Sequence, residues 1–364
     1  AITSYVTWIT GPSVCAAAPD GRKAMHIVFL DNGRSEIAKD PLFSQILRCV
    51  RCGACANVCP VYRMVGGHQY GHIYIGAIGL ISTYFFHGRD KAKNLVQNCI
   101  NCGACKEVCA AGIDLPRLIK EIHARIQDEE GHPLQSQLMR VMLKNRKLFH
   151  GLLRSASKAQ KPVTGGSPYL RHLPYVFSPE HNFRTLPAIA ETPFRDRWEK
   201  IKPTPVAPRY RVALFSGCVE DFVYPEQLEA GLKVLAAQPV AFDFPMDQTC
   251  CGLPLQMMGE KEAARAVAIQ NLEAFEKADY DYIMTLCASC ASHLKNAVPE
   301  LFADDPVWSQ RARAFSDRVV TFSQFLQNVL QIDPALFTGA GQRTTYHAPC
   351  HLCRGMGEHD APKA

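Results

Sequence analysis

The sequence predicts a multidomain protein of the α+β and α/β classes: a mostly helical domain followed by an α/β domain. Its 364 residues allow two or three domains. Two runs of four closely spaced cysteines lie in the first third of the chain. From residue 209 onward, short apolar strands alternate with helical patterns, which is typical of a parallel sheet. Further cysteines follow the ends of these strands.

The composition limits the compartment and the partners. The chain has 16 cysteines, too few for a secreted disulfide scaffold, and most are grouped at metal-ligand spacings. We therefore expect a reducing, cytoplasmic environment. A net charge of +6 does not indicate nucleic-acid binding. The most apolar stretch, Ile73 to Phe86, is too short to span a bilayer.

The first 35 residues form a weakly patterned segment. Ser4–Thr10 and Met25–Leu30 predict two strands, separated by a turn at Gly11-Pro12-Ser13. These elements are too few for a core, so we expect residues 1–35 to be the remnant of a preceding domain. The chain starts without methionine and ends just after a new motif opens, so we expect a fragment of a longer protein.

The two cysteine runs share one spacing, C-x-x-C-x-x-C-x-x-x-C, which matches the bacterial ferredoxin pattern for 4Fe–4S clusters. In that pattern, the fourth cysteine of each run ligates the cluster of the other run. One cluster is then expected on Cys49, Cys52, Cys55 and Cys109. The other is expected on Cys99, Cys102, Cys105 and Cys59. The chemistry that follows is the transfer of single electrons.

Structural zinc is the competing interpretation of these runs. Zinc usually takes two cysteine pairs separated by a longer loop, closing one tetrahedron. Four cysteines within about a dozen residues, present twice, fit zinc poorly. The ligand pattern therefore favours iron–sulfur clusters.

Residues 36–130 are expected to form this two-cluster domain. Asp40 and Pro41 predict the start of a helix that leads into Cys49. Apolar residues at helical spacing predict another helix over Leu115–Ile126. Three histidines lie between the runs, and we expect them to donate hydrogen bonds near cluster sulfurs, with a catalytic role as the alternative: His68, His72 and His87.

Residues 131–208 are expected to be a basic helix followed by a proline-rich linker. Gly131 to Pro179 contains no acidic residue. A solvated basic helix is the simpler interpretation. The alternative is a docking face for an acidic partner or an anionic membrane surface. The prolines after residue 161 predict an extended segment.

The α/β region, residues 209–342, holds a second group of cysteines. Strands are expected at Val212–Phe215, Val240–Phe244 and Tyr282–Leu286, with helices at Pro225–Leu235 and Glu260–Ala278. Open α/β sheets place ligand sites at the carboxyl ends of their strands. Five cysteines at these ends are therefore expected to converge on one metal or iron–sulfur site: Cys218, Cys250, Cys251, Cys287 and Cys290.

Two simpler explanations of these five cysteines remain open. Cys250 and Cys251 could form a redox-active vicinal disulfide, or several of the five could be small buried hydrophobes. A short strand at Thr344–Tyr346 and the motif that follows look like the opening of a second copy of the module. Cys350 is a candidate ligand there, and residues 343–364 would be only the beginning of that copy.

These motifs resemble two lactate-utilisation iron–sulfur proteins joined in one chain. The first part, to about residue 200, resembles the B protein through the two cysteine runs, Gly66-Gly67-His68-x-Tyr70-Gly71 and Phe194-Arg195-x-Arg197-Trp198. The part from about residue 209 resembles the A protein, whose cysteine-rich domain is called CCG. The residues that carry this likeness are Ser216-Gly217-Cys218, Thr249-Cys250-Cys251-Gly252, Cys287-x-x-Cys290 and His347-x-x-Cys350-His351-x-x-Arg354-Gly355.

The resemblance implies an iron–sulfur electron-transfer subunit of an NAD-independent complex that oxidises L-lactate to pyruvate. It implies two 4Fe–4S clusters, a further and unusual cluster in the CCG domain, and other lactate-utilisation subunits as partners. The CCG module is similar to those of glycolate oxidase and heterodisulfide reductase subunits, so either activity is an alternative, as is an electron carrier without a substrate. A peripheral contact with the inner face of the membrane also stays open. No residue is identified as catalytic.

Overall fold

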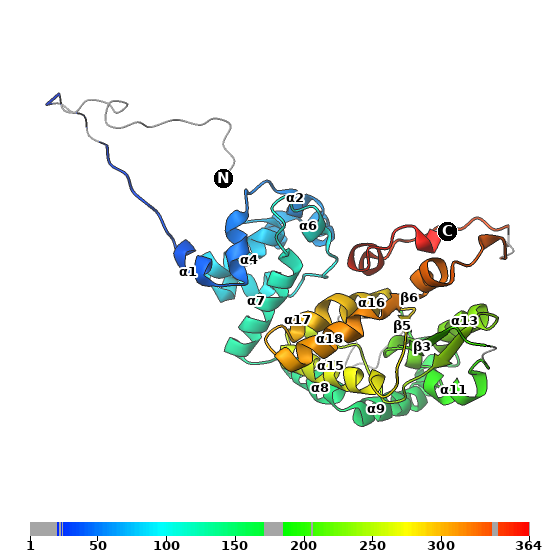
Figure 1. Cartoon of the computed structure of the whole chain (residues 1–364). Coiled ribbons are helices and arrows are strands. Elements are labelled where there is room, and N and C mark those ends of the chain that lie inside the picture. The colour runs from blue at the N-terminus through cyan, green and yellow to red at the C-terminus, as the bar shows by residue number, and fades with distance from the viewer. Residues whose placement is uncertain are drawn as a thin grey trace. The chain divides into compact units, whose positions relative to one another are not determined.

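The protein divides into two compact units, one reaching to Ile126 and the other beginning at Gln127. The computed structural model describes residues 20–21, 23, 25–170, 185–204, 207–336 and 341–363. The expected strand Ser4–Thr10 lies outside these residues. Figure 1 shows a helical first unit and a second unit in which helices surround a sheet. The helical first domain and the parallel sheet of the second are therefore confirmed.

The first unit consists of short helices. Its elements are α1 (Arg34–Lys39), the 3-10 helix η2 (Phe43–Arg48), α2 (Ala54–Asn57), α3 (Pro60–Gln69), α4 (Gly76–His87), α5 (Arg89–Val96), α6 (Ala104–Glu107) and α7 (Leu115–Glu130), the last of which runs past the boundary between the units. The apolar side of α7 and the α4 residues Leu80 and Ile81 form one core with Phe43. The amphipathic pattern of residues 115–126 thus becomes the buried face of α7.

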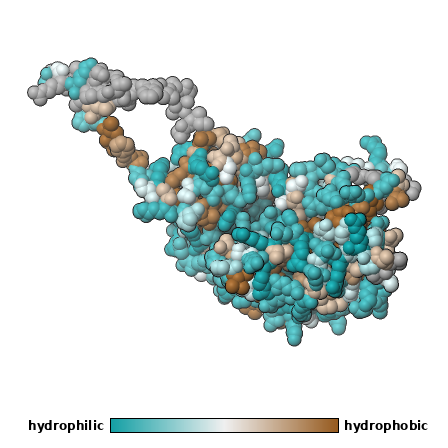
Figure 2. All heavy atoms as spheres, viewed as in Figure 1, coloured by the Kyte–Doolittle hydropathy of each residue, from teal (hydrophilic) through white to brown (hydrophobic). Residues whose placement is uncertain are grey.

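One expectation for the start of this unit is wrong. Met25–Leu30 has no strand partner among the described residues, and Phe29 is 92% exposed. A strand needs hydrogen bonds from a neighbour to persist. Figure 2 shows this segment as a brown, apolar stretch leading to α1. The helix expected to lead into Cys49 is present as the 3-10 helix η2, which ends at Arg48. The Asp40 carboxylate accepts hydrogen bonds from the N–H groups of Leu42 and Phe43, each at 2.9 Å.

The second unit is built on a four-stranded parallel sheet with strand order β4-β3-β5-β6. The strands are β3 (Tyr210–Leu214), β4 (Val240–Asp243), β5 (Tyr282–Thr285) and β6 (Val319–Thr321); the first three match the expected strands, and β6 was not expected. Val212 and Leu214 face one core, while Ala213 faces the other. Burial on both faces explains why these strands are continuous apolar runs.

Helices cover both faces of this sheet. The helices of this unit up to the last strand are α8 (Leu134–Lys144), α9 (Arg146–Ala159), α10 (Lys161–Thr164), α11 (Phe194–Ile201), α12 (Val219–Phe222), α13 (Pro225–Leu235), α14 (Leu253–Met257), α15 (Lys261–Phe275), α16 (Ala288–Ser292), the π-helix η4 (His293–Ala297), α17 (Val298–Leu301) and α18 (Pro306–Asp317). After β6 follow α19 (Phe322–Gln324), the π-helix η5 (Phe325–Leu330), the 3-10 helix η6 (Pro334–Leu336), the π-helix η7 (His351–Gly355) and the 3-10 helix η8 (Ala361–Lys363).

The expected basic helix is two helices, because Asn145 ends α8 and its side chain caps α9 through the Leu148 N–H at 3.1 Å. Four of the basic side chains are paired with acids of the same unit. The pairs are Arg140–Glu260 (3.8 Å), Arg146–Asp247 (2.6 Å), Arg154–Asp196 and Lys161–Glu191 (2.7 Å). Much of the basic charge on α8, α9 and α10 is therefore used in ion pairs within the second unit.

The proline-rich segment is only partly extended. It contains the two-residue strands β1 (Tyr169–Leu170) and β2 (Leu186–Pro187), which pair antiparallel. Helix α11 then buries Phe194 and Trp198 in the core beside the sheet. The Arg195 Nε donates a hydrogen bond to the buried Asp221 at 2.8 Å, within α12. The arginine–tryptophan motif thus anchors this segment next to Cys218.

Candidate functional site

Four cysteines surround one cavity in the first unit. Cys49, Cys52 and Cys55 come from the first cysteine run, and Cys109 is the last cysteine of the second run. The cavity encloses about 410 Å³, part of it open to solvent, and most of its other lining residues are apolar. A space of this kind accommodates a group larger than a single ion.

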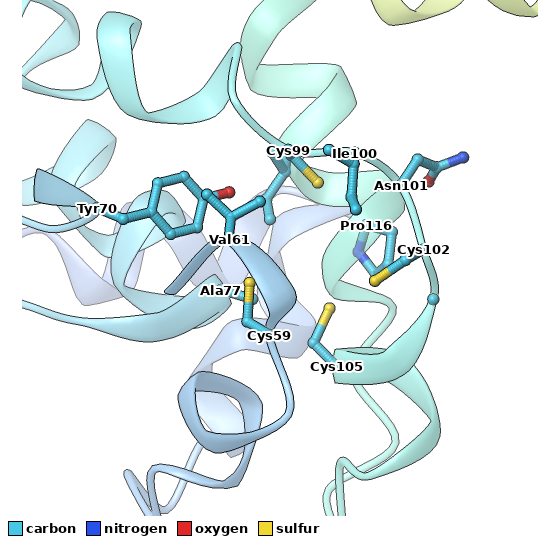
Figure 3. A pocket seen from close by; sticks show the side chains of 12 residues that line it. Cys59, Val61, Tyr70, Ala77, Cys99, Ile100, Asn101, Cys102, Cys105 and Pro116 are labelled. Carbon is cyan, nitrogen blue, oxygen red and sulfur yellow. The ribbon is translucent and has the colours of Figure 1, made fainter. Parts of the chain in front are cut away.

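A second cavity of about 340 Å³ repeats the arrangement. Cys99, Cys102 and Cys105 line it together with Cys59, the last cysteine of the first run. Figure 3 shows their four sulfurs around a common space. Each run therefore contributes three cysteines to one cavity and its fourth to the other. This is the grouping expected from the sequence; that these sulfurs bind iron stays a prediction.

The local backbone explains how seven residues place three sulfurs around one cavity. In both runs, the residue before the second cysteine and the glycine after it are left-handed: Arg51 (φ 58°) and Gly53 (φ 81°), and Asn101 (φ 55°) and Gly103 (φ 78°). The Arg51 N–H donates to the Cys49 sulfur at 3.4 Å, and the Asn101 N–H bonds the Cys99 sulfur. Such N–H groups stabilise a thiolate.

The first turn of α4 closes the first cavity. The pKa of Cys55 is raised by burial, which outweighs hydrogen bonds from the Ile78 and Ala77 N–H groups. Gly76, with φ 74°, lies so close that a Cβ there would be 3.1 Å from the Cys55 sulfur. The glycine therefore lets the helix N-terminus reach the sulfur.

The charge balance fits a cluster. Burial raises the pKa of Cys99 to about 11, and burial with the neighbouring cysteines raises that of Cys105. Buried thiolates therefore need compensating positive charge, which several iron ions supply. Within the described part of the chain, no three His, Cys, Asp or Glu side chains are disposed to hold one metal ion.

The second unit brings together the five cysteines that were expected to converge. Cys218 follows β3, Cys250 and Cys251 follow β4, and Cys287 and Cys290 follow β5, all at the carboxyl edge of the sheet. Their sulfurs form one hydrogen-bonded chain in the order Cys218, Cys250, Cys251, Cys290 and Cys287. The strand order reverses between β3 and β5, where such sheets bind ligands.

The five thiols differ in acidity because of this chain. Hydrogen bonds from Cys250 and Cys290 lower the pKa of Cys251 to about 6. A hydrogen bond from Cys290 and the N–H groups at the start of α16 lower the pKa of Cys287 to about 6. The pKa of Cys218 is raised by its bond to Cys250 and by burial. Five such sulfurs form a donor set for a metal cluster.

Buried polar residues, which the sequence did not reveal, hold these loops. The Gln248 side chain donates to the Leu214 carbonyl and accepts from the Ser216 N–H, both at 2.9 Å. The Asn271 side chain, on α15, accepts from the Thr249 N–H at 2.9 Å and donates to the Cys250 carbonyl at 2.8 Å. Asn271 is an amide side chain among the apolar residues of α15, and this exception to the pattern is the signal that could have identified it as a buried polar residue.

Gly217 lies close to the five thiols. Its φ is 61°, and a Cβ there would be 3.1 Å from the Cys290 sulfur. A Cβ on Gly252 would make only ordinary contacts, at 3.6 Å, but the φ of 95° is a backbone conformation that requires glycine.

Glu220 is a further buried group that the sequence did not reveal, 4% exposed. Burial and the nearby Cys287 and Cys218 raise its pKa.

The motif near the end of the chain packs on this domain without joining the five thiols. The structure has no strand at Thr344–Tyr346. Cys350 is the N-cap of η7, and the His351 Nδ1 lies 2.8 Å from the Ser289 hydroxyl of α16. The Gly355 carbonyl accepts a hydrogen bond from Asn296 at 2.7 Å. Cys350 is therefore near α16 but outside the sulfur chain.

The expected histidines do not line either cavity. His68 is exposed, while the rings of His72 and His87 contact each other with centroids 5.1 Å apart. The expectation of hydrogen bonds to cluster sulfurs is not met by these contacts. Tyr70 lines the second cavity instead. No helix in the described ranges is long and apolar enough to cross a membrane.

Two regions of the chain match family models. A 4Fe-4S dicluster domain matches residues 45–113, and a cysteine-rich domain, CCG, matches residues 212–295. The probable glycolate oxidase iron-sulfur subunit of Bacillus subtilis (strain 168) is 30% identical over 331 residues, which cover 85% of this chain and 71% of that protein.

Two lactate utilization proteins are also similar to parts of the chain. Protein B 1 of Bacillus mycoides (strain KBAB4) is 37% identical over 55% of this chain and 41% of its own length. Protein A of Exiguobacterium sp. (strain ATCC BAA-1283 / AT1b) is 36% identical over 42% of this chain and 61% of its own length. The chain thus spans only about two fifths and three fifths of these two relatives. No solved structure matches.

Proposed function

The chain belongs to the family of iron–sulfur proteins represented by the glycolate oxidase iron–sulfur subunit, and from this premise we propose that it is an electron-transfer subunit. The proposed reaction is the NAD-independent oxidation of L-lactate to pyruvate. In this proposal, Cys49, Cys52, Cys55 and Cys109 bind one 4Fe–4S cluster, and Cys59, Cys99, Cys102 and Cys105 bind the other. The five thiols of the α/β domain bind a further cluster.

The observation that carries the proposal is the pair of four-cysteine cavities in one small unit. Clusters bound there supply one-electron exchange without proton chemistry. The chain itself fixes the sulfurs through left-handed loop residues, donates N–H groups to them and surrounds them with apolar side chains. These features support an electron-carrying role more directly than a substrate-binding one.

L-Lactate is the proposed substrate of the complex, and glycolate is the alternative. Both are 2-hydroxy acids, and relatives of this chain carry both names. We propose that companion subunits supply the acid–base groups and the first electron acceptor, because the described residues show no such assembled group beside the cavities. The electron acceptor beyond this chain is left open by the proposal.

The test is anaerobic reduction by substrate. The purified chain should contain iron and acid-labile sulfide in equal amounts, and it should not reduce a dye with L-lactate alone. With its genetically neighbouring subunits, L-lactate should bleach the clusters faster than glycolate does. The reverse preference would assign glycolate oxidation. Zinc without sulfide, or no bleaching by either acid in the assembled complex, would contradict the proposal.

A matched variant makes the assay specific to the clusters. Cys102→Ser removes one proposed ligand, whereas Ser82→Ala, on α4 and away from both cavity linings, keeps every ligand. Only the first change should slow electron delivery to the dye. Equal rates for the two variants would place the electron path elsewhere.

A further inference from the structure

Tyr70 is the one hydroxyl-bearing side chain that lines either four-cysteine cavity in the described structure. It is 2% exposed and shares the second cavity with Cys59, Cys99, Cys102 and Cys105. Figure 3 shows its ring at the edge of the cavity with the hydroxyl turned inward, on the side of Cys99. The first cavity is lined by apolar residues, Gly53 and Arg51 besides its cysteines.

The glycine-rich motif Gly66-Gly67-His68-x-Tyr70-Gly71 explains how the ring reaches this place. Helix α3 starts at Pro60, directly after Cys59, and Gly66 breaks its regular conformation with φ 75° and ψ 174°. A Cβ on Gly67 would be 3.1 Å from the Tyr62 hydroxyl oxygen, and one on Gly71 would be 2.7 Å from the Gly67 carbonyl oxygen. The chain therefore folds back tightly here, and Tyr70 is buried by that turn.

The hydroxyl keeps its proton in this environment. A phenol ordinarily has a pKa near 10, so Tyr70 carries its proton at neutral pH. A neutral phenol is a hydrogen-bond donor, and the cavity offers sulfur as the acceptor. Donors to cluster sulfur stabilise the reduced, more negative state and so raise its reduction potential.

Resting on the proposed function, we infer that Tyr70 is a tuning residue that raises the reduction potential of the cluster in the second cavity and not that of the first. The hydroxyl donates its hydrogen bond to a sulfur of that cluster and retains its proton throughout. The glycine motif then affects redox behaviour, because its tight turn places the Tyr70 hydroxyl beside the cluster of the second cavity. The cluster of the first cavity has no such donor from a side-chain hydroxyl in the described structure. The two clusters consequently differ in how readily they accept an electron.

The test is Tyr70→Phe in the full chain, which removes only the hydroxyl. Anaerobic redox titration with mediators, followed by electron paramagnetic resonance, should show one cluster with a lowered potential and the other unchanged. We expect the ratio of reduced to oxidised cluster at fixed potential to fall about tenfold, equivalent to about 59 mV for one electron. The signal lost in Cys59→Ser identifies the cluster of the second cavity.

Tyr74→Phe is the matched control. Tyr74 lies in the same segment, with its ring centroid 5.6 Å from that of His87, and it lines neither cavity. This change should leave both potentials where they are. Unchanged potentials in Tyr70→Phe, or an equal shift of both clusters, would overturn the inference. Because mediators deliver the electrons, the result does not depend on whether lactate is the substrate.

A second measurement detects the proposed hydrogen bond directly. Electron–nuclear double resonance of the reduced wild-type chain in H₂O and in D₂O should detect an exchangeable, strongly coupled proton at the cluster of the second cavity. Loss of that proton in Tyr70→Phe would assign it to the phenol. Its persistence there would assign it to a backbone N–H and contradict the role of Tyr70.

Discussion

The two cysteine-bearing units place their sulfurs by different means. In the first unit, three of four sulfurs around each cavity come from a single seven-residue loop, and left-handed residues such as Gly53 and Gly103 shape that loop. In the second unit, five sulfurs come from three loops that only the parallel sheet brings together. The comparison indicates that the first site depends on local backbone geometry, and the second on long-range packing. Four changes would break or sharpen this difference.

The largest effect is expected from Cys59→Ser. Although Cys59 belongs to the first run, it lines the cavity of the second. The variant should lose about four iron atoms per chain, and the lost signal should belong to Cys99, Cys102 and Cys105. Iron analysis with Mössbauer spectroscopy measures this, and Cys218→Ser is the control that should keep both clusters. Loss of the cluster on Cys49 instead would refute the crossed arrangement.

Asn271→Leu should damage only the second unit. It leaves the buried Thr249 N–H and Cys250 carbonyl without their partner, and each such group costs about 1–3 kcal/mol. We expect a lower unfolding temperature of that unit, with the first unit's clusters retained. Gln270→Leu, the adjacent change on α15, removes an exposed hydrogen bond to the Lys144 carbonyl and should cost less than about 1 kcal/mol. Equal effects of the two would contradict the packing argument.

Gly76→Ala tests the local geometry of the first unit. Gly76 and Gly88 lie at the two ends of α4 with φ of 74° and 84°. Alanine at either position has a positive φ that side chains rarely adopt, which costs about 1–3 kcal/mol. At Gly76, a Cβ would also be 2.9 Å from the Ala56 Cβ, whereas Gly88 has open space, so overpacking adds about 1–3 kcal/mol there. Denaturant unfolding of Gly76→Ala and Gly88→Ala should show this difference; equal losses would mean that the contact with Cys55 is not tight.

The smallest effect concerns Asp40, and it depends on pH. Burial raises the pKa of Asp40, but hydrogen bonds from Phe43, Leu42 and Arg125 outweigh it and hold the pKa below its ordinary value. Its stabilising contribution is therefore present above the ordinary pKa near 4 and disappears as the pH falls through the lowered value. Asp40→Asn removes the carboxylate charge that faces Arg125 and should cost up to about 1 kcal/mol at pH 7 and little at acid pH. If the stability difference between the wild-type chain and Asp40→Asn grew as the pH fell, the pKa of Asp40 would be raised and not lowered by folding.

Much of both units could be predicted from the sequence because the relevant signals are local. The spacing of the cysteine runs predicts which cysteines share a cavity, and apolar runs predict β3, β4 and β5 because a parallel strand is buried on both faces. The sheet in turn predicts that Cys218, Cys250 and Cys287 meet at one edge. The apolar run Met25–Leu30 also predicts a strand, and this prediction is wrong. An apolar run carries no information about whether a partner strand is present.

Other features were decided by tertiary structure alone. Proline content predicts an extended segment, yet α11 is helical because Phe194 and Trp198 find a core to fill. Histidines between the cysteine runs are reasonable candidates for hydrogen bonds to sulfur, but Tyr70 takes that place because tight glycine turns bury it in the second cavity. The candidate cluster ligands can thus be predicted from the spacing of the cysteines along the sequence, because this spacing is a local property of the covalent chain. The groups that surround each cluster depend on side chains that meet only after folding, and no spacing rule specifies them.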